Sequence, residues 1–363
     1  MTTNRIIEPA ATRKGSASMG VAYPVGSIRF DRLMAGLSLW LIAGLFLDGW
    51  AHNSFHDIET FLTPWHAVLY SGLGASAVAL GIPWINNVQR GYRWDHALPK
   101  EYVISLLGVL IFGVAGGLDF AWHSTFGFEI DTEALLSPPH LLLATGGLFI
   151  ISGPLRAAWQ RLPDKGATGW AKLWPAMVSA FATLSTFTFF TQFSNQFQHA
   201  NTFVGGGPTE DVYFWQVTTI SYILIPTVLY IGFILLLMRR WALPIGSMVL
   251  FILGNAMLMF FMGSSYTGEQ WPVLLAALLG SVIVDVLYTV LKPSADRVRE
   301  LRIFAFAAPL VLNLLYLGVL IATGGIWWRI HMWLGAPILS AAIGLGLSYL
   351  TVPPTTQWSG GQT

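Results

Sequence analysis

The sequence predicts an all-α, polytopic integral membrane protein with about ten transmembrane helices arranged as tandem helical hairpins. Of the 363 residues, 54% are hydrophobic and only 10% are charged, whereas a soluble domain carries about 25% charged residues. The mean hydropathy is +0.60. Apolar runs of about 20 residues, long enough to cross a bilayer, recur along the whole chain. Such runs favour one membrane body over the two soluble domains that the length alone would permit.

The predicted helices follow one another with short connections. They are centred on 31–51, 64–86, 101–121, 137–159, 170–192, 213–238, 242–263, 270–291, 302–323 and 333–352. Residues 29–160 form a duplicated unit of two similar hairpins, and residues 161–353 supply further helices of the same membrane domain. Residues 1–28 are polar and lack the apolar core of a signal peptide, so we expect a flexible cytoplasmic tail. Residues 354–363 are expected to form a second flexible tail.

Charge is distributed unevenly between the two predicted sides of the membrane. Eighteen of the 19 Lys and Arg residues lie in or beside the N-terminal tail and every second connection, and only Arg329 lies on the other side. The positive-inside rule then places both termini in the cytoplasm, and we expect the membrane to be a bacterial or archaeal cell membrane. Seven of the eight His residues lie at the opposite face, with His96 as the exception. This separation predicts a functional site at the outer face.

Two stretches of the chain repeat one another in residues that bind metals. The first stretch reads Asp48-x3-His52-x6-Glu59-x2-Leu62-Thr63-Pro64-x-His66. The second reads Asp119-x3-His123-x9-Glu133-x2-Leu136-Ser137-Pro138-x-His140. Carboxylates and imidazoles are costly in or near lipid. A membrane chain that keeps four such residues in the same order twice is therefore predicted to use them.

The spacing predicts one set of metal donors in each hairpin. An Asp and a His four residues apart share one face of a helix, here at the outer end of an outward-running helix. The Thr-Pro and Ser-Pro pairs are helix-start signals, with the hydroxyl as N-cap and Pro in the first turn. The second His of each copy then falls in the first turn of the returning helix. The predicted ligands are Asp48, His52 and His66 in one hairpin and Asp119, His123 and His140 in the other.

The ligand types limit the metals that these sites suit. Because the chain contains no Cys, the donors are nitrogen and oxygen, and an Asp/His/His set suits copper, zinc or iron. Glu59 and Glu133 precede the N-caps and are predicted as further ligands, as partners that orient a His, or as stabilisers of the helix N-terminus. The alternative for each Asp/His pair is capping or mutual pairing without a metal. Weaker candidates in the two loops are His56, Asp57, Glu129 and Asp131.

Three further candidate residues lie outside the repeated motifs. His199 and His331 stand alone in the sequence, and we interpret each as a polar residue between helices rather than as a ligand. Asp285 falls in the middle of the eighth predicted helix, where a carboxylate is a candidate functional group. Its alternative role is a hydrogen bond with a neighbouring Asn such as Asn255 or Asn313.

The segment from Asp48 to His66 resembles a known metal site. It is similar to the motif in the C subunit of the copper membrane monooxygenases, the particulate methane and ammonia monooxygenases, which runs Asp-x3-His and continues to Thr-Pro-x-His. In that family the Asp and the two His bind the metal. The resemblance implies a copper site at the outer membrane face that oxidises a small apolar or ammonia-like substrate with O2. It covers the motif only, because the family's subunit has fewer helices and one such motif. The implied copper ligands are Asp48, His52 and His66, and through the internal repeat Asp119, His123 and His140.

The leading hypothesis is a copper-dependent oxidoreductase of the monooxygenase type, or a subunit of one. The first alternative is a metal, cation or proton transporter, or a binding subunit without catalysis, that uses Asp285 and the outer carboxylates. Further alternatives are a haem-ligating electron-transfer subunit and an accessory subunit. The expected partners are the lipid bilayer, a small-molecule substrate and other chains of a homo- or hetero-oligomeric complex. The net charge of +1 gives no indication of a nucleic-acid partner, and we expect none.

Overall fold

The computed structural model describes residues 22–55, 63–127, 132–161, 169–263 and 270–354. These residues are largely helical, and their β pairing consists of two isolated bridges, Val204 with Ile326 and Ser294 with Arg297. Within the described ranges, nine helices are long and apolar enough to cross a membrane. The all-α, polytopic membrane fold is therefore confirmed. Most of each predicted tail, residues 1–21 and 355–363, lies outside the described residues.

The helices occur close to the predicted ranges. The spanning helices are α1 (Ile28–Ser54), α2 (Pro64–Gln89), α3 (Lys100–Phe126), α5 (Pro138–Ile151) continued by α6 (Gly153–Arg161), α7 (Trp170–Phe190), α8 (Val212–Arg240), α10 (Pro272–Leu291), α11 (Val298–Thr323) and α12 (Ile330–Thr351). The shorter elements in the described ranges are η1 (Trp94–His96), α4 (Thr132–Leu136), η2 (Gln192–Ser194), η3 (Ala200–Phe203), the π-helical turn η4 (Val249–Leu253) and α9 (Gly254–Met262).

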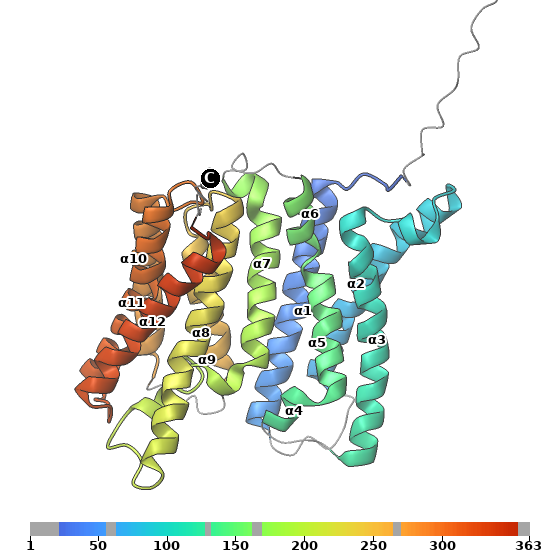
Figure 1. Cartoon of the computed structure of the whole chain (residues 1–363). Helices are drawn as coiled ribbons and strands as arrows, with labels where there is room; N and C mark the ends of the chain where they lie inside the picture. Colours follow the sequence, from blue (N-terminus) through green and yellow to red (C-terminus); the bar gives the residue numbers. More distant parts are fainter. Residues whose placement is uncertain (1–21, 56–62, 128–131, 162–168, 264–269, 355–363) are drawn as a thin grey trace, which may run out of the picture.

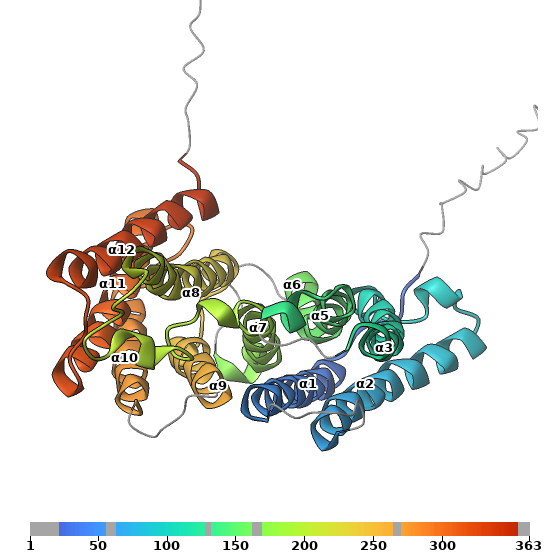
Figure 2. The same ribbon diagram turned by 90° about the horizontal axis from the view of Figure 1, so that it is seen from below.

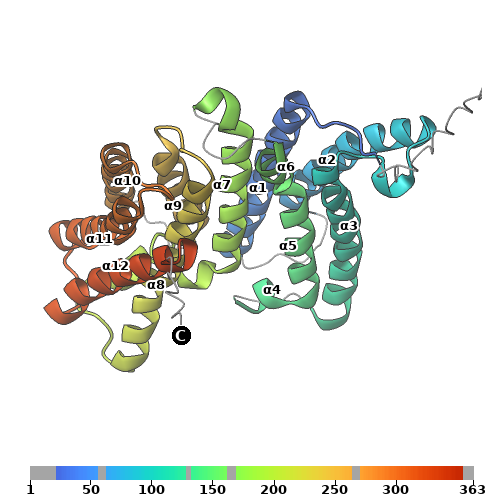
Figure 3. The same ribbon diagram turned by 45° about the horizontal axis from the view of Figure 1, so that its top comes forward.

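The helices stand side by side, and α1 and α2 run in opposite directions, as do α3 and α5 (Figure 1). Helix α7 lies between α1–α6 on one side and α8–α12 on the other (Figures 2 and 3). The described ends of the chain, near residues 22 and 354, both lie at the end of the bundle where α1 begins (Figure 1). The repeated motifs lie at the opposite end, where α1 and α3 finish.

Large apolar side chains cover the outside of the bundle. On α3, Leu110, Val114 and Leu118 are 61%, 64% and 47% exposed. Because they recur every four residues, they form one stripe along the helix. A continuous apolar stripe of this kind on an exposed helix marks a membrane-contacting surface. The apolar helices therefore present their outer faces to the lipid bilayer.

The helix predicted at 242–263 is shorter in the structure. Helical structure begins only at Ser247, and the apolar segment Val249–Met262 is too short to count among the spanning helices. Two local features explain the late start. Pro244 has no N–H to donate to a helical turn, and Gly246 has a φ of +91°, which places it in a conformation that ends regular helix.

Asp285 on α10 closes the start of this short helix. Its Oδ2 accepts a hydrogen bond from Gly246 N at 2.6 Å, and its Oδ1 accepts one from Met248 N at 3.2 Å. The Asp285 carboxylate thus satisfies backbone amides at a helix N-terminus, where negative charge is favoured. Asn255 and Asn313 donate instead to hydroxyl groups on neighbouring helices.

The fourth predicted helix is kinked into α5 and α6. Pro154 follows the break and has no N–H for the turn before it. The carbonyl oxygen of Phe149, near the kink, accepts hydrogen bonds from Ser105 Oγ at 2.9 Å and from Arg156 Nη2 at 3.0 Å. The kink therefore keeps its backbone groups partnered, as membrane-embedded structure requires.

A buried ionic cluster joins α1, α3 and α6 at the end where α1 begins. Arg161 pairs with Asp31, and its Nε lies 3.0 Å from Glu101 Oε1. Tyr102 donates its hydroxyl hydrogen to Asp31 Oδ1 at 2.6 Å. Asp31 is 4% exposed and Glu101 7% exposed. The cluster fixes the two motif-bearing hairpins to one another at the end away from the motifs.

Glycines bring the helices of both motif-bearing hairpins into close contact. On α3, a Cβ atom at Gly108 would lie 2.6 Å from Gly146 O of α5. On α1, a Cβ atom at Gly44 would lie 2.7 Å from Leu69 Cα of α2. Backbones approach this closely between membrane helices only where the residues are small. These contacts set the spacing of the helices that carry the Asp and His side chains.

We expect Gly146→Ala to lower the free energy of unfolding by about 1–3 kcal/mol, the usual cost of overpacking. The new methyl group would lie 2.7 Å from Phe112 N and 2.8 Å from Gly108 O, so α3 and α5 must separate. Unfolding of the purified protein in mild detergent measures the change. Gly147→Ala is the matched control, because its methyl group would meet Phe112 at an ordinary 3.6 Å. Equal stability of the two variants would contradict the close contact between α3 and α5 at Gly146.

Candidate metal centre

The first donor set forms where α1 ends and α2 begins. Asp48 and His52 lie one turn apart in the last two turns of α1. His66 lies in the first turn of α2, where Thr63 is the N-cap and its Oγ1 accepts from His66 N at 3.2 Å. The predicted helix-start signal therefore operates as expected, with Pro64 in the first turn. It fixes the position from which His66 faces the end of α1.

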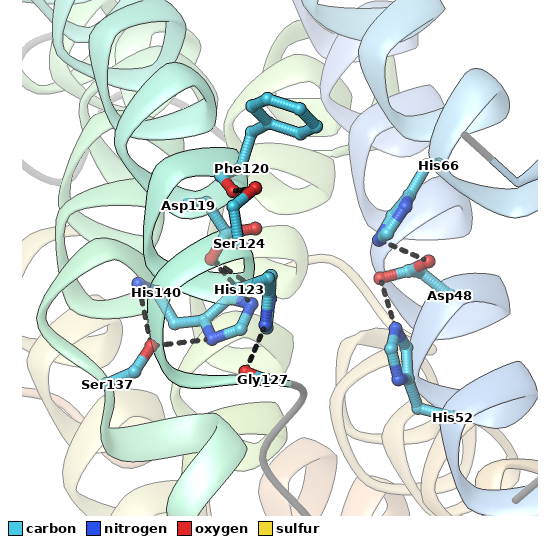
Figure 4. A network of polar contacts seen from close by, with 10 residues as sticks. All are labelled: Asp48, His52, His66, Asp119, Phe120, His123, Ser124, Gly127, Ser137 and His140. Atoms are coloured by element: carbon cyan, nitrogen blue, oxygen red, sulfur yellow. Dashed lines mark hydrogen bonds and ion pairs between the residues drawn. The ribbon is translucent and has the colours of Figure 1, made fainter. Parts of the chain in front are cut away.

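The three side chains of this set converge on one another (Figure 4). His66 Nε2 lies 3.2 Å from Asp48 Oδ1, and His52 Nε2 lies 3.9 Å from Asp48 Oδ2. The side chains of Asp48 and His66 are 15% and 11% exposed, whereas that of His52 is 37% exposed. The carboxylate is therefore mostly shielded, and His52 provides the accessible side of the set.

The second donor set repeats this arrangement between α3 and α5. His123 Nε2 lies 3.4 Å from Asp119 Oδ1, and His140 Nε2 lies 3.5 Å from the same oxygen. Ser137 is the N-cap of α5, and its Oγ accepts from His140 N at 3.4 Å. Asp119 and His123 are nearly buried, with 3% and 8% of their side chains exposed, and His140 is 27% exposed.

The second ring nitrogen of each His in this set has its own partner. His123 Nδ1 lies 3.3 Å from Gly127 O, which can only accept, so this nitrogen carries the ring hydrogen. His140 Nδ1 lies 2.8 Å from Ser137 Oγ, and a hydrogen on Nδ1 there donates to the hydroxyl. In that tautomer both Nε2 atoms turn a lone pair toward Asp119. Such outer hydrogen bonds orient His side chains that bind metals.

The carboxylate at the centre of each set lacks the hydrogen bond that burial demands. Within the described part of the chain, Asp48 Oδ1 and Asp119 Oδ1 are buried oxygens that accept no hydrogen bond. Ionic N–H···O bonds are about 2.7–2.9 Å long, and the four imidazole–carboxylate distances exceed that range. In a tetrahedral metal site with ligand bonds of about 2.1 Å, two ligand atoms lie roughly 3.4 Å apart. The imidazole–carboxylate distances are closer to this ligand–ligand spacing than to a hydrogen-bond length.

The donor atoms in each set fit a single ion. In both Asp/His/His groups, one donor atom from each residue lies within 4.8 Å of the other two. No other group of three or more such side chains comes together among the described residues. The structure therefore contains two groups that could hold a metal, one in each motif-bearing hairpin.

Of the two predicted glutamates, the structure describes only Glu133. Glu133 is exposed on α4 and does not join Asp119, His123 and His140. Glu59 lies outside the described residues. The same is true of the weaker loop candidates His56, Asp57, Glu129 and Asp131.

Tyr70, which the sequence did not single out, lies between the two groups. It follows His66 by one turn of α2, and their ring centroids are 6.3 Å apart. A Cβ atom at Gly116 of α3 would lie 2.7 Å from the Tyr70 hydroxyl, so the absence of a side chain there makes room for the ring. The hydroxyl interacts electrostatically with both Asp48 and Asp119. The only signal in the sequence was a Tyr four residues after His66, a predicted ligand.

The two groups are close enough to influence one another. His52 interacts electrostatically with His123 and His140 as well as with the members of its own set. Figure 4 shows the two sets side by side at the same depth of the bundle. They are separate groups in neighbouring hairpins rather than one shared set.

His199 in the third hairpin serves a structural contact. Its Nε2 lies 3.0 Å from Gln192 O, and its ring stacks on Tyr222 with centroids 4.7 Å apart. Burial lowers its pKa, so the ring stays neutral and donates to the carbonyl. Gln192 also accepts from Asn53 at the end of α1. His331 is exposed at the start of α12.

Comparisons of the chain with models of protein families, with curated proteins and with solved structures found no match. The functional argument therefore depends on the geometry of the two groups and on the sequence motif that encodes them.

We expect Ser137→Ala to lower the free energy of unfolding by about 1 kcal/mol, the usual cost of losing an N-cap. The change removes both the cap of α5 and the partner of His140 Nδ1. Unfolding in detergent with a metal chelator present measures the contribution of the N-cap without any contribution from metal binding. Ser124→Ala is the control, because its hydroxyl bonds only to Phe120 O within α3. Ser137→Thr restores the hydroxyl and should restore stability; a loss equal to that of the alanine variant would count against the cap.

Proposed function

We propose that the protein is a membrane metalloprotein that binds one copper ion at each Asp/His/His group and acts in the oxidation of a small substrate. The observation that carries the proposal is the convergence of one buried carboxylate oxygen and two Nε2 atoms at metal-ligand spacing, repeated in two hairpins. A buried carboxylate without a hydrogen bond is costly, and a cation bound between the three donors removes that cost.

The donor chemistry supports copper among the candidate metals. Imidazole nitrogens suit copper, and copper binds N and O donors more tightly than the other divalent metals of its row. The resemblance of the first motif to the copper site of the membrane monooxygenases agrees with this choice. Three protein ligands leave coordination positions open for a substrate or O2. Copper would supply one-electron redox chemistry at these positions.

The residues around the ions have defined tasks. Asp48 and Asp119 supply negative charge that offsets the charge of a cation near lipid. Ser137 and Gly127 hold the His rings of the second set so that Nε2 faces the ion. His52, the most exposed ligand, marks the side from which a small molecule reaches the first set.

Two other functions fit the structure less well. For proton or cation transport, the intramembrane carboxylate Asp285 would have to face a path, but backbone amides occupy both its oxygens. For haem ligated by two histidines, the two imidazoles must bind the iron from opposite faces of the porphyrin ring. In the second set Asp119 Oδ1 lies 3.4 and 3.5 Å from the two Nε2 atoms, within the space that the ring would need.

We expect His52→Ala and His123→Ala each to remove one of the two metal ions bound by the wild type, because the groups are separate. Elemental analysis of the purified protein, after exposure to copper and removal of free ions, measures this. His331→Ala is the matched control, since it removes an exposed His that belongs to neither group.

Two results would count against this assignment. A wild type that retains no copper, zinc or iron would remove the proposed function. Loss of all metal in either single variant would show a shared centre instead of two.

We expect copper-loaded protein in lipid to consume O2 in the presence of a reductant, and zinc-loaded protein to consume none, because zinc has no redox chemistry. An oxygen electrode measures the rate. The double variant His52→Ala/His123→Ala should be slower by more than about tenfold, with His331→Ala near the wild type. Equal rates for the double variant and the wild type would assign the oxygen consumption to adventitious copper.

A further inference from the structure

A cavity of about 370 Å³ lies at the end of the bundle opposite the two donor sets. Its walls are the end of α8, the extended segment 241–245, the end of α10 and the turn 293–296. It is remote from the repeated motifs, and none of the predicted functions uses it. Figure 1 shows that α8 and α10 end at the level where α1 begins, and the residues that line the cavity belong to these helix ends.

Three cationic side chains line this cavity. They are Arg239 and Arg240 at the end of α8 and Lys292 just after α10. Arg240 is held in place, since its Nη2 donates to Trp159 O at 2.7 Å and its guanidinium lies 5.6 Å from the centroid of the Trp159 ring. Arg239 and Lys292 are exposed. Asp296 adds one negative charge, so the lining keeps an excess of two positive charges.

A buried aromatic residue also lines the cavity. Trp241 is 2% exposed, and its ring packs edge-on against Trp159, with centroids 5.2 Å apart. This packing holds Trp159, the partner of Arg240, beside the cavity. An oxygen-rich anion placed among the cations would neutralise their excess charge.

The remaining lining is mostly apolar, apart from Thr289 and Ser294, and continues into the exposed apolar surface of the bundle. Met238, Ala242 and Ile245 line the cavity, and Ile245 is 70% exposed. Val290, the last residue but one of α10, is 71% exposed. A ligand that has both an anionic group and an apolar portion therefore fits better than a free inorganic anion, which would leave the apolar wall without a partner.

We propose that this cavity binds the headgroup of an anionic phospholipid. Its phosphodiester lies among Arg239, Arg240 and Lys292, and its acyl chains follow the exposed apolar side chains of α8 and α10. The position agrees with the distribution of charge along the chain, because the cavity lies at the Lys- and Arg-rich end of the bundle. Basic pockets between helices on that side of a membrane bind such headgroups. The proposal does not depend on metal binding.

The test is a titration of the full chain in detergent with phosphatidylglycerol, with bound lipid counted by native mass spectrometry. The wild type should bind phosphatidylglycerol more tightly than phosphatidylcholine. Arg239→Gln/Lys292→Gln should weaken phosphatidylglycerol binding by about thirtyfold, since each cation near a lipid surface contributes about 1 kcal/mol. Thermal unfolding without added lipid verifies that the variant folds. If it does not, Lys292→Gln alone should weaken binding by about fivefold.

The matched control is Arg93→Gln/Arg297→Gln. It removes the same charge from the same end of the bundle, but at exposed residues that pair with Asp95 and Glu300 outside the cavity. Its affinity should stay near that of the wild type. An equal loss in both double variants would show diffuse surface attraction and overturn the proposal. Displacement of phosphatidylglycerol by an equal concentration of inorganic phosphate would assign a free-anion site instead and overturn it as well.

Discussion

The high cost of charge in hydrocarbon governs where this protein can place its ionic and polar side chains. At one end of the bundle, Arg161 joins Asp31 and Glu101 across three helices. At the other end, each carboxylate of the repeated motif faces two imidazoles. Asp285, in the second half of α10, accepts hydrogen bonds from backbone amides at a helix start. The structural ion pairs and the candidate metal donors therefore obey one constraint. An ionic side chain is stable near lipid only where the fold places a partner beside it.

The two candidate centres depend on local sequence patterns, namely the N-cap and the helical spacing, and on close contacts between helices. A hydroxyl followed by Pro begins each returning helix and places its His in the first turn. The opposing Asp and His are fixed by helical spacing alone. Glycine contacts then hold the paired helices at one distance, near Gly44 in the first hairpin and between Gly108 and Gly146 in the second. The donors meet because rigid elements present them, which is how precise binding sites are generally built.

The sequence predicted what depends on composition and on spacing along the chain. Hydropathy located the helices, and the i, i+4 and N-cap patterns identified the six residues that come together. The rest depends on contacts between distant segments. The late start of the seventh helix involves Asp285, nearly 40 positions away in the chain. The position of Tyr70 depends on the missing side chain of Gly116 on another helix. Glu133 matched the repeat in sequence, but the turn of α4 leaves it exposed.

The placement of the two donor sets side by side has an electrical consequence. Each set contains one carboxylate, and His52 is within electrostatic range of the second set. A cation that enters either set cancels part of the negative potential that attracts the next one. The hairpins would therefore fill in two steps of unequal affinity, even though their ligands are the same. With such a pair, the concentration of metal in the surroundings would decide whether the proposed centres hold a single ion or both.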